Sequence, residues 1–285
     1  ALANLNAFLA AKTGVSKVLT GMISSGTYSN FDYMPSDAEV AAGADELAGV
    51  AEFEKVMLPL FLEHDEFLAI YQSNYPSRKV LKFHREDAGY IGIQQRRFIA
   101  NATDATGAPI DTGHRRGLLR PVGTDFWDVT AANFSEWVPK AYDPFAKSWY
   151  QTGTAMNAGE LKFEGPVKQT YTDVSGASAF NLIFKAPIPA GGHSVFKFKF
   201  LTASIVNLLR GMEFGEHGSI HVVGDDWTVV ASNRLDTQKD GDFYDLRTGD
   251  SDVNQIPDDA LDLAKLQGTT AGGIEKSASY TTDSG

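Results

Sequence analysis

The chain has 285 residues, a formal net charge of -11 and no cysteine. Its length suits two domains of about 100–150 residues, and its acidic balance argues against nucleic acid and anionic membrane surfaces as partners. The lack of cysteine excludes disulfides, thiol catalysis and zinc–thiolate sites.

Residues 1–66 are predicted to be mainly helical, because apolar residues recur there at spacings of three and four. The first stripe consists of Leu2, Leu5, Phe8, Leu9, Val15, Val18, Leu19, Met22 and Ile23. The second stripe consists of Leu47, Val50, Phe53, Val56, Met57 and Leu60. Pro59 is expected to kink or end the second helix. A long helix with one apolar stripe needs a broad surface to lie against, such as the face of a sheet.

From Phe67 the hydrophobic period changes to two, which is typical of strands. Strands are predicted at residues 67–71, 79–84, 90–98, 167–172, 179–185 and 195–201. Residues 101–125 are rich in Gly, Thr, Asp and Pro and are predicted to be loop. Short helices are predicted at 204–209 and 260–266, and a hairpin at 219–223 and 228–232. Without regular βαβ spacing, this order favours an α+β fold with an antiparallel sheet.

A candidate ligand site lies in the stretch Tyr-Asp-Pro-Phe-Ala-Lys-Ser-Trp-Tyr at residues 142–150. Tyr142, Trp149 and Tyr150 offer flat faces with a polar end, and Lys147 adds a mobile cation. Pro144 should bend the chain here. The stretch suits a lid over a small polar ligand; a packed loop whose aromatics only fill a core is the alternative.

This stretch resembles the Tyr-Asp-Pro-Arg-x-Arg-Pro-Trp-Tyr signature of double Cache sensor domains. Later segments resemble the same family in the same order, namely residues 165–173, 181–188, 195–209 and 218–233. The resemblance implies a long N-terminal helix beside two PAS-like antiparallel-sheet modules. We therefore expect a helical region at 1–66, a membrane-distal module at 67–210 and a membrane-proximal module at 211–285. The second module is expected to be incomplete, because the family pattern needs two more strands after Tyr280.

The resemblance also implies a function. Double Cache domains are extracytoplasmic, small-molecule sensing parts of bacterial chemoreceptors, histidine kinases and nucleotide cyclases. The expectation is thus a periplasmic domain of an inner-membrane protein that binds a small organic ligand without catalysis and without a cofactor. Contact with the membrane would come only through segments outside this chain. The N-terminal helix is a candidate contact for a homodimer.

Site residues carry over from the family one position at a time. Tyr142, Trp149, Tyr150 and Tyr171 match residues with which amino-acid-binding members hold their ligand, and Asp173 closes the matching strand motif. Lys147 stands where those members have Arg. Lys199 aligns with the Asp that holds the ligand ammonium, which argues against an amino acid as ligand.

A carboxylate anion is therefore the favoured ligand, held by Lys147, Lys199 and Lys185 on the neighbouring strand. On the last strand, Lys199 shares one face with Val195 and Lys197, while Phe196, Phe198 and Phe200 occupy the other. An amino-acid-binding sensor is one alternative. In another, Lys185, Lys197 and Lys199 only line a solvated sheet face and pair with surface acids.

An enzyme of unknown chemistry acting on a small molecule is the remaining alternative. The chain has neither a Gly-x-Ser-x-Gly elbow nor a Gly-x-x-x-x-Gly-Lys phosphate loop. Its six His are scattered without metal-ligand spacing. Asp236 opens a calcium-like loop, but Arg247 stands where a bidentate Glu is needed. No metal site is predicted, and turnover of a ligand would distinguish an enzyme from a sensor.

Overall fold

The computed structural model describes residues 2–27, 41–43, 48–64, 66–75, 79–85, 91–103, 109–119, 138–139, 144–168, 178–189, 191–211, 221–223, 228–233, 238–239 and 242–243. It contains helices and an antiparallel sheet, so the predicted α+β class is confirmed. The chain divides into two compact units. One comprises residues 16–160 and 182–199, and the other comprises 1–15, 161–181 and 200–285. The predicted boundaries at 66 and 210 stay predictions.

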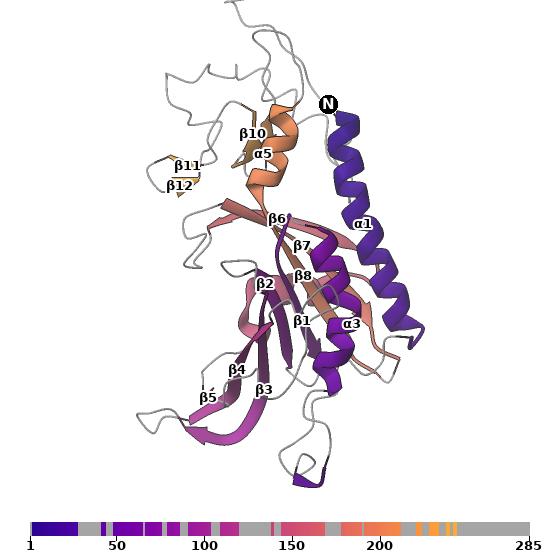
Figure 1. Ribbon diagram of the computed structural model, residues 1–285, viewed down its shortest axis with the longest axis vertical. Helices are drawn as coiled ribbons and strands as arrows, with labels where there is room; N and C mark the ends of the chain where they lie inside the picture. The colour runs from indigo at the N-terminus through magenta and orange to yellow at the C-terminus, as the bar shows by residue number, and fades with distance from the viewer. Residues whose placement is uncertain are drawn as a thin grey trace, which may run out of the picture. The chain divides into compact units, whose positions relative to one another are not determined.

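Helix α3 (Ala48–Glu63) and most strands of the main sheet belong to the first of these units. The strands of this sheet, drawn in Figure 1, are β1 (Phe67–Tyr75), β2 (Val80–Arg85), β3 (Ile91–Thr103), β4 (Pro109–Leu119), β5 (Val138–Pro139), β6 (Leu161–Lys168), β7 (Ser178–Pro187) and β8 (His193–Leu201). The sheet order is β5-β4-β3-β2-β1-β8-β7-β6. The pairs β1–β2, β2–β3, β3–β4 and β4–β5 are all antiparallel.

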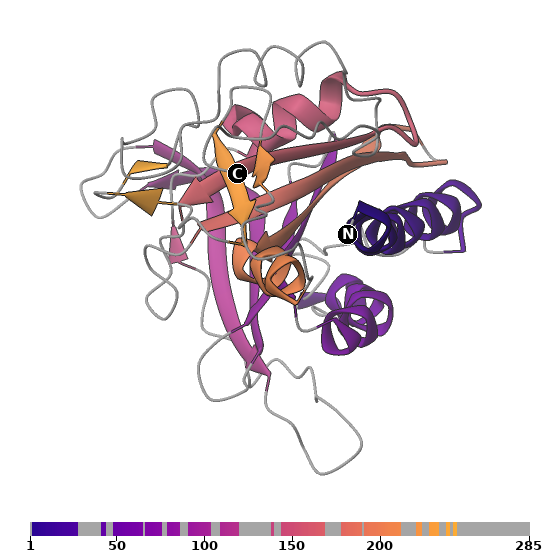
Figure 2. The same ribbon diagram turned by 90° about the horizontal axis from the view of Figure 1, so that it is seen from above.

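Helices α3 and α4 (Ser148–Ala155) cover opposite faces of this sheet (Figure 2). Helix α3 packs against β1 and β2, where the rings of Phe61 and Phe83 lie 6.5 Å apart. Side chains of a strand alternate between its two faces, so Lys82 and His84 point away from Phe83, toward the α4 face. On β8, Phe196 and Phe198 likewise alternate with Lys197, as predicted.

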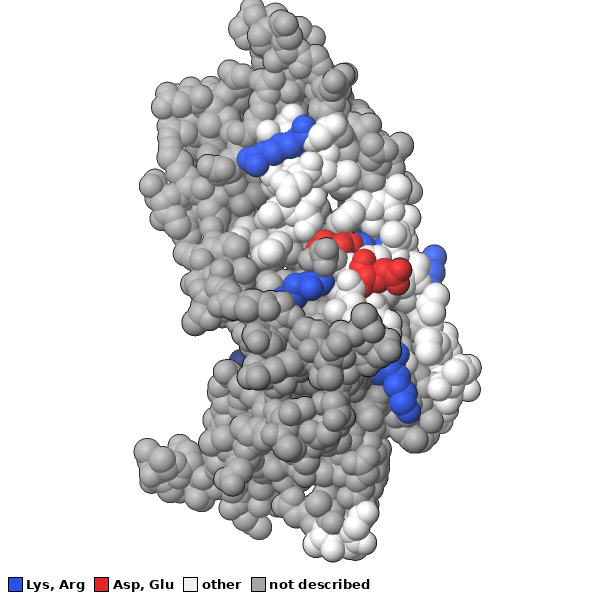
Figure 3. Space-filling model, in the orientation of Figure 1, with Lys and Arg blue, Asp and Glu red and all other residues white. Residues whose placement is uncertain are grey.

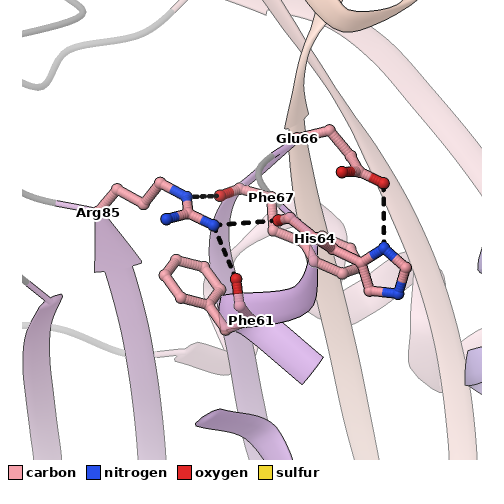
Figure 4. A network of polar contacts seen from close by, with 5 residues as sticks. All are labelled: Phe61, His64, Glu66, Phe67 and Arg85. Carbon is pink, nitrogen blue, oxygen red and sulfur yellow. Dashed lines mark hydrogen bonds and ion pairs between the residues drawn. The ribbon is translucent and has the colours of Figure 1, made fainter. Parts of the chain in front are cut away.

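A guanidinium group ties the end of α3 to the start of the sheet (Figure 4). Arg85, at the end of β2, donates to the carbonyl oxygens of Phe61 (2.7 Å), His64 (3.1 Å) and Phe67 (2.9 Å). The last carbonyls of a helix lack partners within the helix, and Arg85 supplies them from a neighbouring strand. Its guanidinium carbon also lies 4.7 Å from the ring centroid of Phe61. His64 Nδ1 and Glu66 Oε1 lie 3.2 Å apart on the same turn.

Two predictions for the helical region need correction. Helix α1 runs from Leu2 to Ser24 as expected and buries Leu19 and Ile23, but Val18 is 62% exposed. Val18 lies about 100° around the helix from Leu19, outside the buried line. Helix α3 does not end at Pro59 but continues to Glu63. Pro59 lies on its exposed side, so the proline costs one hydrogen bond and some crowding of the preceding turn but leaves the buried face of the helix intact.

The predicted loop at 101–125 was wrong over much of its length. Strand β3 continues to Thr103, and β4 occupies Pro109–Leu119. The two strands pair from Ile91↔Leu119 to Thr103↔Pro109 with an irregularity after Phe98. This ladder satisfies the backbone groups of β4 and overrides the low strand propensity of its glycines. Strand β6 also begins earlier than predicted, at Leu161.

The second unit contains a helix and small strand pairs. Helix α5 (Thr202–Arg210) packs against β10 (Val229–Ser232), and Thr202 Oγ1 donates to the Ser178 carbonyl (3.0 Å). Strand β10 pairs antiparallel with β9 (His221–Val223), which confirms the predicted hairpin. Strands β11 (Gln238–Lys239) and β12 (Asp242–Phe243) form a second small pair. The predicted helix at 260–266 lies outside the described residues.

Candidate functional site

Helix α4 forms an aromatic cover over one face of the sheet. It follows a short 3-10 turn, η4 (Pro144–Ala146), which lies where Pro144 was predicted to bend the chain. Trp149 and Tyr150 are 6% and 3% exposed, whereas Lys147 at the start of α4 is exposed. A buried cluster joins these two aromatics and Met156, which follows α4, to four residues of the sheet: Ala69, Tyr71, Ile183 and Val195.

Gly153 allows α4 to approach the sheet closely. A Cβ atom at this position would overlap a methyl group of Val195 and would lie 3.2 Å from a methyl group of Ile183. A residue with a side chain would therefore require the Val195 side chain or the helix to shift. Trp149 is thereby held directly above β1 and β8, with its ring centroid 6.1 Å from that of Tyr71.

A row of polar side chains crosses four neighbouring strands on the sheet face that α4 partly covers. Tyr71 on β1 is the register partner of Lys82 on β2, and Lys82 is the partner of Gln94 on β3. On β8, Lys197 reaches Tyr71 from the other side. Lys82 and Lys197 are only 4% and 8% exposed. Burying ammonium groups on a sheet face is costly, so such a row is typical of a functional site rather than of a core.

The two lysines meet at one aromatic ring. Lys197 Nζ lies 3.8 Å from the ring centroid of Tyr71 and 4.9 Å from that of Trp149. Lys82 Nζ lies 5.4 Å from the Tyr71 centroid. These distances are within the range of cation–π attraction, which stabilises a desolvated ammonium by about 2 kcal/mol. The site therefore combines two positive charges with two aromatic faces.

Lys199 continues the same face of β8, one alternation beyond Lys197. It is half-buried, and its burial lowers its pKa to about 8. The charged form of Lys199 is thus lost as the pH rises through about 8, well below the ordinary lysine value. Any anion that approaches Lys199 would favour the charged form again.

Lys185 lies toward the other end of this face. The register of the β7–β8 hairpin follows from the stacked rings of Phe184 and Phe196 (4.8 Å) and from the hydrogen bond between Ile188 N–H and the Gly192 carbonyl (3.2 Å). Lys185 then lies beside Val195, about 13 Å along the strand from Lys199. Its Nζ donates to the Thr154 carbonyl (2.8 Å), one of the last carbonyls of α4. Lys185 therefore stabilises the end of the covering helix.

A second set of ring contacts holds α4 beside the turn between β7 and β8. The ring of Phe145 stacks on Tyr150 at 4.6 Å, and His193 stacks on Tyr75 at 5.2 Å. His193 Nε2 lies 3.4 Å from both the Tyr150 hydroxyl and Thr154 Oγ1. Desolvation, followed by the nearby charge of Lys185, lowers the pKa of His193.

Acidification should weaken the contact between His193 and α4. A lowered pKa in the folded state means that the unfolded chain binds more protons between that pKa and about 6.5, so stability falls as pH decreases through this interval. We expect the Tm of the wild type to fall between pH 7 and pH 5 more steeply than that of His193→Gln. Thermal unfolding across this range checks the difference, and parallel curves for the two proteins would contradict it.

The structure shows the position of only part of the predicted residue set, and the binding roles of all its members stay predictions. Tyr142, Tyr171 and Asp173 lie outside the described residues, so their roles stay predictions. Trp149 and Tyr150 are both buried residues of α4, and Lys199 lies on β8, on the sheet face that α4 covers. Sequence reasoning missed Tyr71 and Lys82, and counted Lys197 only among lysines of a solvated face. Lys82 and Lys197 each follow a pattern in which a lysine alternates with buried Phe residues along a strand. This alternation predicts that both lysines lie on the sheet face away from those Phe residues, and it could have identified them.

Other features of the described residues offer no competing site. They contain no group of three or more His, Asp and Glu side chains placed to hold a metal ion. None of the described helices combines the length and the hydropathy needed to cross a membrane. On the face drawn in Figure 3, the described charged side chains lie as separate spots, with one place where acidic and basic residues are neighbours.

No protein-family model matches the chain, and no curated protein does. Among solved structures, the ligand-binding domain of the Pseudomonas aeruginosa amino-acid chemoreceptor PctC, in complex with GABA, is 13% identical, with a TM-score of 0.43 over 80% of this chain and 68% of that one. The corresponding domain of PctB from the same organism, in complex with L-Arg, is 14% identical, with a TM-score of 0.41 over 86% and 69%.

The extracellular domain of a proposed histidine kinase, mmHK1S-Z2, is 10% identical, with a TM-score of 0.45 over 94% of this chain and 79% of that one. All three TM-scores are below 0.5, and all three identities are below 25%. The function proposed next therefore rests on the residues of this chain and not on these similarities.

Proposed function

We propose that this chain is the extracytoplasmic sensing part of a bacterial transmembrane receptor and binds a small organic anion beneath α4. One observation supports this proposal most directly. Trp149 packs above a sheet face that holds the buried ammonium groups of Lys82 and Lys197. Small-molecule sites typically combine apolar walls with a few convergent polar groups. The proposed role is binding without turnover, with a signal passed on by segments outside the described residues.

The charge of the site favours a carboxylate over an amino acid. Lys82 and Lys197 lie on the two sides of Tyr71, and half-buried Lys199 extends the same face. Each charge-assisted hydrogen bond from an ammonium to a carboxylate contributes about 1.5–3 kcal/mol. Lysine is a point donor rather than a planar fork, so several small carboxylates should bind with modest differences among them. Tyr142, Tyr171, Asp173 and Lys147 are proposed to complete the site.

Thermal-shift screening at low salt tests this proposal. Acetate, propionate and succinate, each compared with sodium chloride at equal ionic strength, should raise the Tm of the wild type. A Lys147→Met, Lys199→Met double variant should lose most of that rise. Lys162→Met is the matched control, because Lys162 is an exposed lysine on β6, and it should respond like the wild type.

Each contrary result points to a different alternative. Stabilisation by amino acids but not by simple carboxylates would support an amino-acid sensor and remove the anion proposal. Chemical change of the bound carboxylate, followed by NMR, would support the enzyme alternative. An undiminished shift in the double variant would exclude Lys147 and Lys199 as ligand contacts.

Carboxylate binding should weaken as the pH rises through about 8, the value to which burial lowers the pKa of Lys199. The unliganded protein should behave in the opposite way. Between about 8 and the ordinary lysine value of about 10.4, the unfolded chain binds more protons, so its folded state gains stability as pH rises. Calorimetric titration with propionate from pH 7 to 9 measures how the affinity changes with pH. In Lys199→Met, both the affinity for propionate and the stability of the unliganded protein should depend less on pH. An affinity that is constant over this range would exclude Lys199 as a ligand contact.

A further inference from the structure

The ammonium group of Lys197 occupies the place where two aromatic faces meet beneath α4. Its Nζ lies 3.8 Å from the Tyr71 ring centroid and 4.9 Å from the Trp149 centroid, and its side chain is 8% exposed. Aromatic faces at such distances bind ammonium groups, whether they belong to the protein or to a ligand. In this site the cation is part of the protein.

We propose that Lys197 determines the ligand class, because its own ammonium fills the aromatic faces of Tyr71 and Trp149 and so excludes ligands that carry an ammonium group. This inference rests on the proposed function, since it concerns the same site. It adds a specificity-determining residue and an excluded chemical class to the anion preference proposed above.

Two physical effects act in the same direction. A ligand ammonium would have to displace the Lys197 side chain from both rings to gain the same cation–π attraction. If it entered beside Lys197, it would meet like charge in a poorly solvated place, where Coulomb repulsion is much stronger than in water. Lys82, whose Nζ is 5.4 Å from the same Tyr71 ring, adds to that repulsion.

Chemical rescue tests whether the rings hold a cation. Lys197→Ala removes the atoms from Cγ to Nζ, and n-propylammonium contains the same atoms as a free molecule. n-Propanol has nearly the same shape without the charge. We expect n-propylammonium chloride to raise the Tm of Lys197→Ala by about 2 °C more than n-propanol or sodium chloride does. The wild type and Lys162→Ala, which replaces an exposed lysine, should show no such difference. Equal effects of the amine and the alcohol would overturn the proposal.

A second variant keeps the test decisive if Lys197→Ala does not fold. Lys197→Met retains most of the packing, and its thioether chain ends near the position of the lysine Cε, so only the cation is removed. Ammonium chloride should then stabilise Lys197→Met more than sodium chloride at equal ionic strength, with no difference for the wild type. No selective effect of ammonium in either variant would overturn the proposal.

The exclusion itself is measured with propionate and L-alanine, which differ only in the ammonium group. The wild type should respond to propionate alone, and the affinity ratio of alanine to propionate should rise about tenfold in Lys197→Ala, equivalent to about 1.4 kcal/mol. If the wild type responds to neither compound, the proposed anion binding fails, and the amine rescue still decides the position of the cation. If the wild type binds L-alanine as well as propionate, the exclusion fails although the sensor function stands.

Discussion

Replacing Trp149 by alanine should lower the free energy of unfolding by about 3–5 kcal/mol, the usual cost of truncating a buried tryptophan. Trp149 is 6% exposed and packs in the cluster that joins α4 to β1, β7 and β8. Its ring contacts Tyr71 at 6.1 Å and Tyr150 at 5.8 Å, and it covers the Lys197 ammonium. Without the indole, the cluster contains a cavity and the cation loses one of its two rings. Urea unfolding should show a lower midpoint at an unchanged slope.

Two companion variants separate packing from other causes. Trp149→Phe keeps an aromatic ring above Lys197 and should lose less than half as much stability. Val18→Ala removes two methyl groups from a residue of α1 that is 62% exposed, and should change stability by no more than about 0.5 kcal/mol. If Trp149→Ala cost no more than Val18→Ala, α4 would not be packed on the sheet as described.

Local patterns were sufficient to predict most elements of the fold. Alternation of apolar residues predicted β1, β2, β7 and β8, because these strands bury one or both faces in a packed sheet. The same reasoning missed β4, whose sequence contains Pro, Asp and two Gly and lacks a clear apolar alternation. Its strand conformation is stabilised by the long ladder with β3, and a pairing between segments is not visible in the composition of either one.

The candidate site was predictable only in part, for a related reason. The stretch at 142–150 stood out because its aromatic residues are neighbours in the sequence. Tyr71, Lys82 and Lys197 come from three strands, and they meet only after the sheet order places β8 beside β1. Lys185 shows the opposite case, since it lies on a strand next to Lys199 but is separated from it by the hairpin register and bonds to Thr154.

Replacing Arg85 by methionine should cost about 2–4 kcal/mol of stability. The guanidinium donates to three carbonyl oxygens, of Phe61, His64 and Phe67, at 2.7–3.1 Å. Hydrogen bonds from a charged donor contribute about 1.5–3 kcal/mol each, and water can replace part of this at a half-buried position. Methionine retains packing against the Phe61 ring but leaves the end of α3 and the first residue of β1 without their shared donor. The midpoint of urea unfolding measures the loss.

The planar geometry of the Arg85 guanidinium, rather than its charge alone, should account for most of this loss of stability. Arg85→Lys keeps the positive charge but offers a single ammonium, which cannot reach three carbonyls from two directions, so it should recover less than half of the loss. Arg210→Met is the control, because Arg210 is exposed in the last turn of α5, where a charge near a helix end contributes about 0.3–1 kcal/mol. If Arg85→Lys were as stable as the wild type, charge near the end of α3 would be sufficient. The shared hydrogen bonds to α3 and β1 would then not be what holds this junction together.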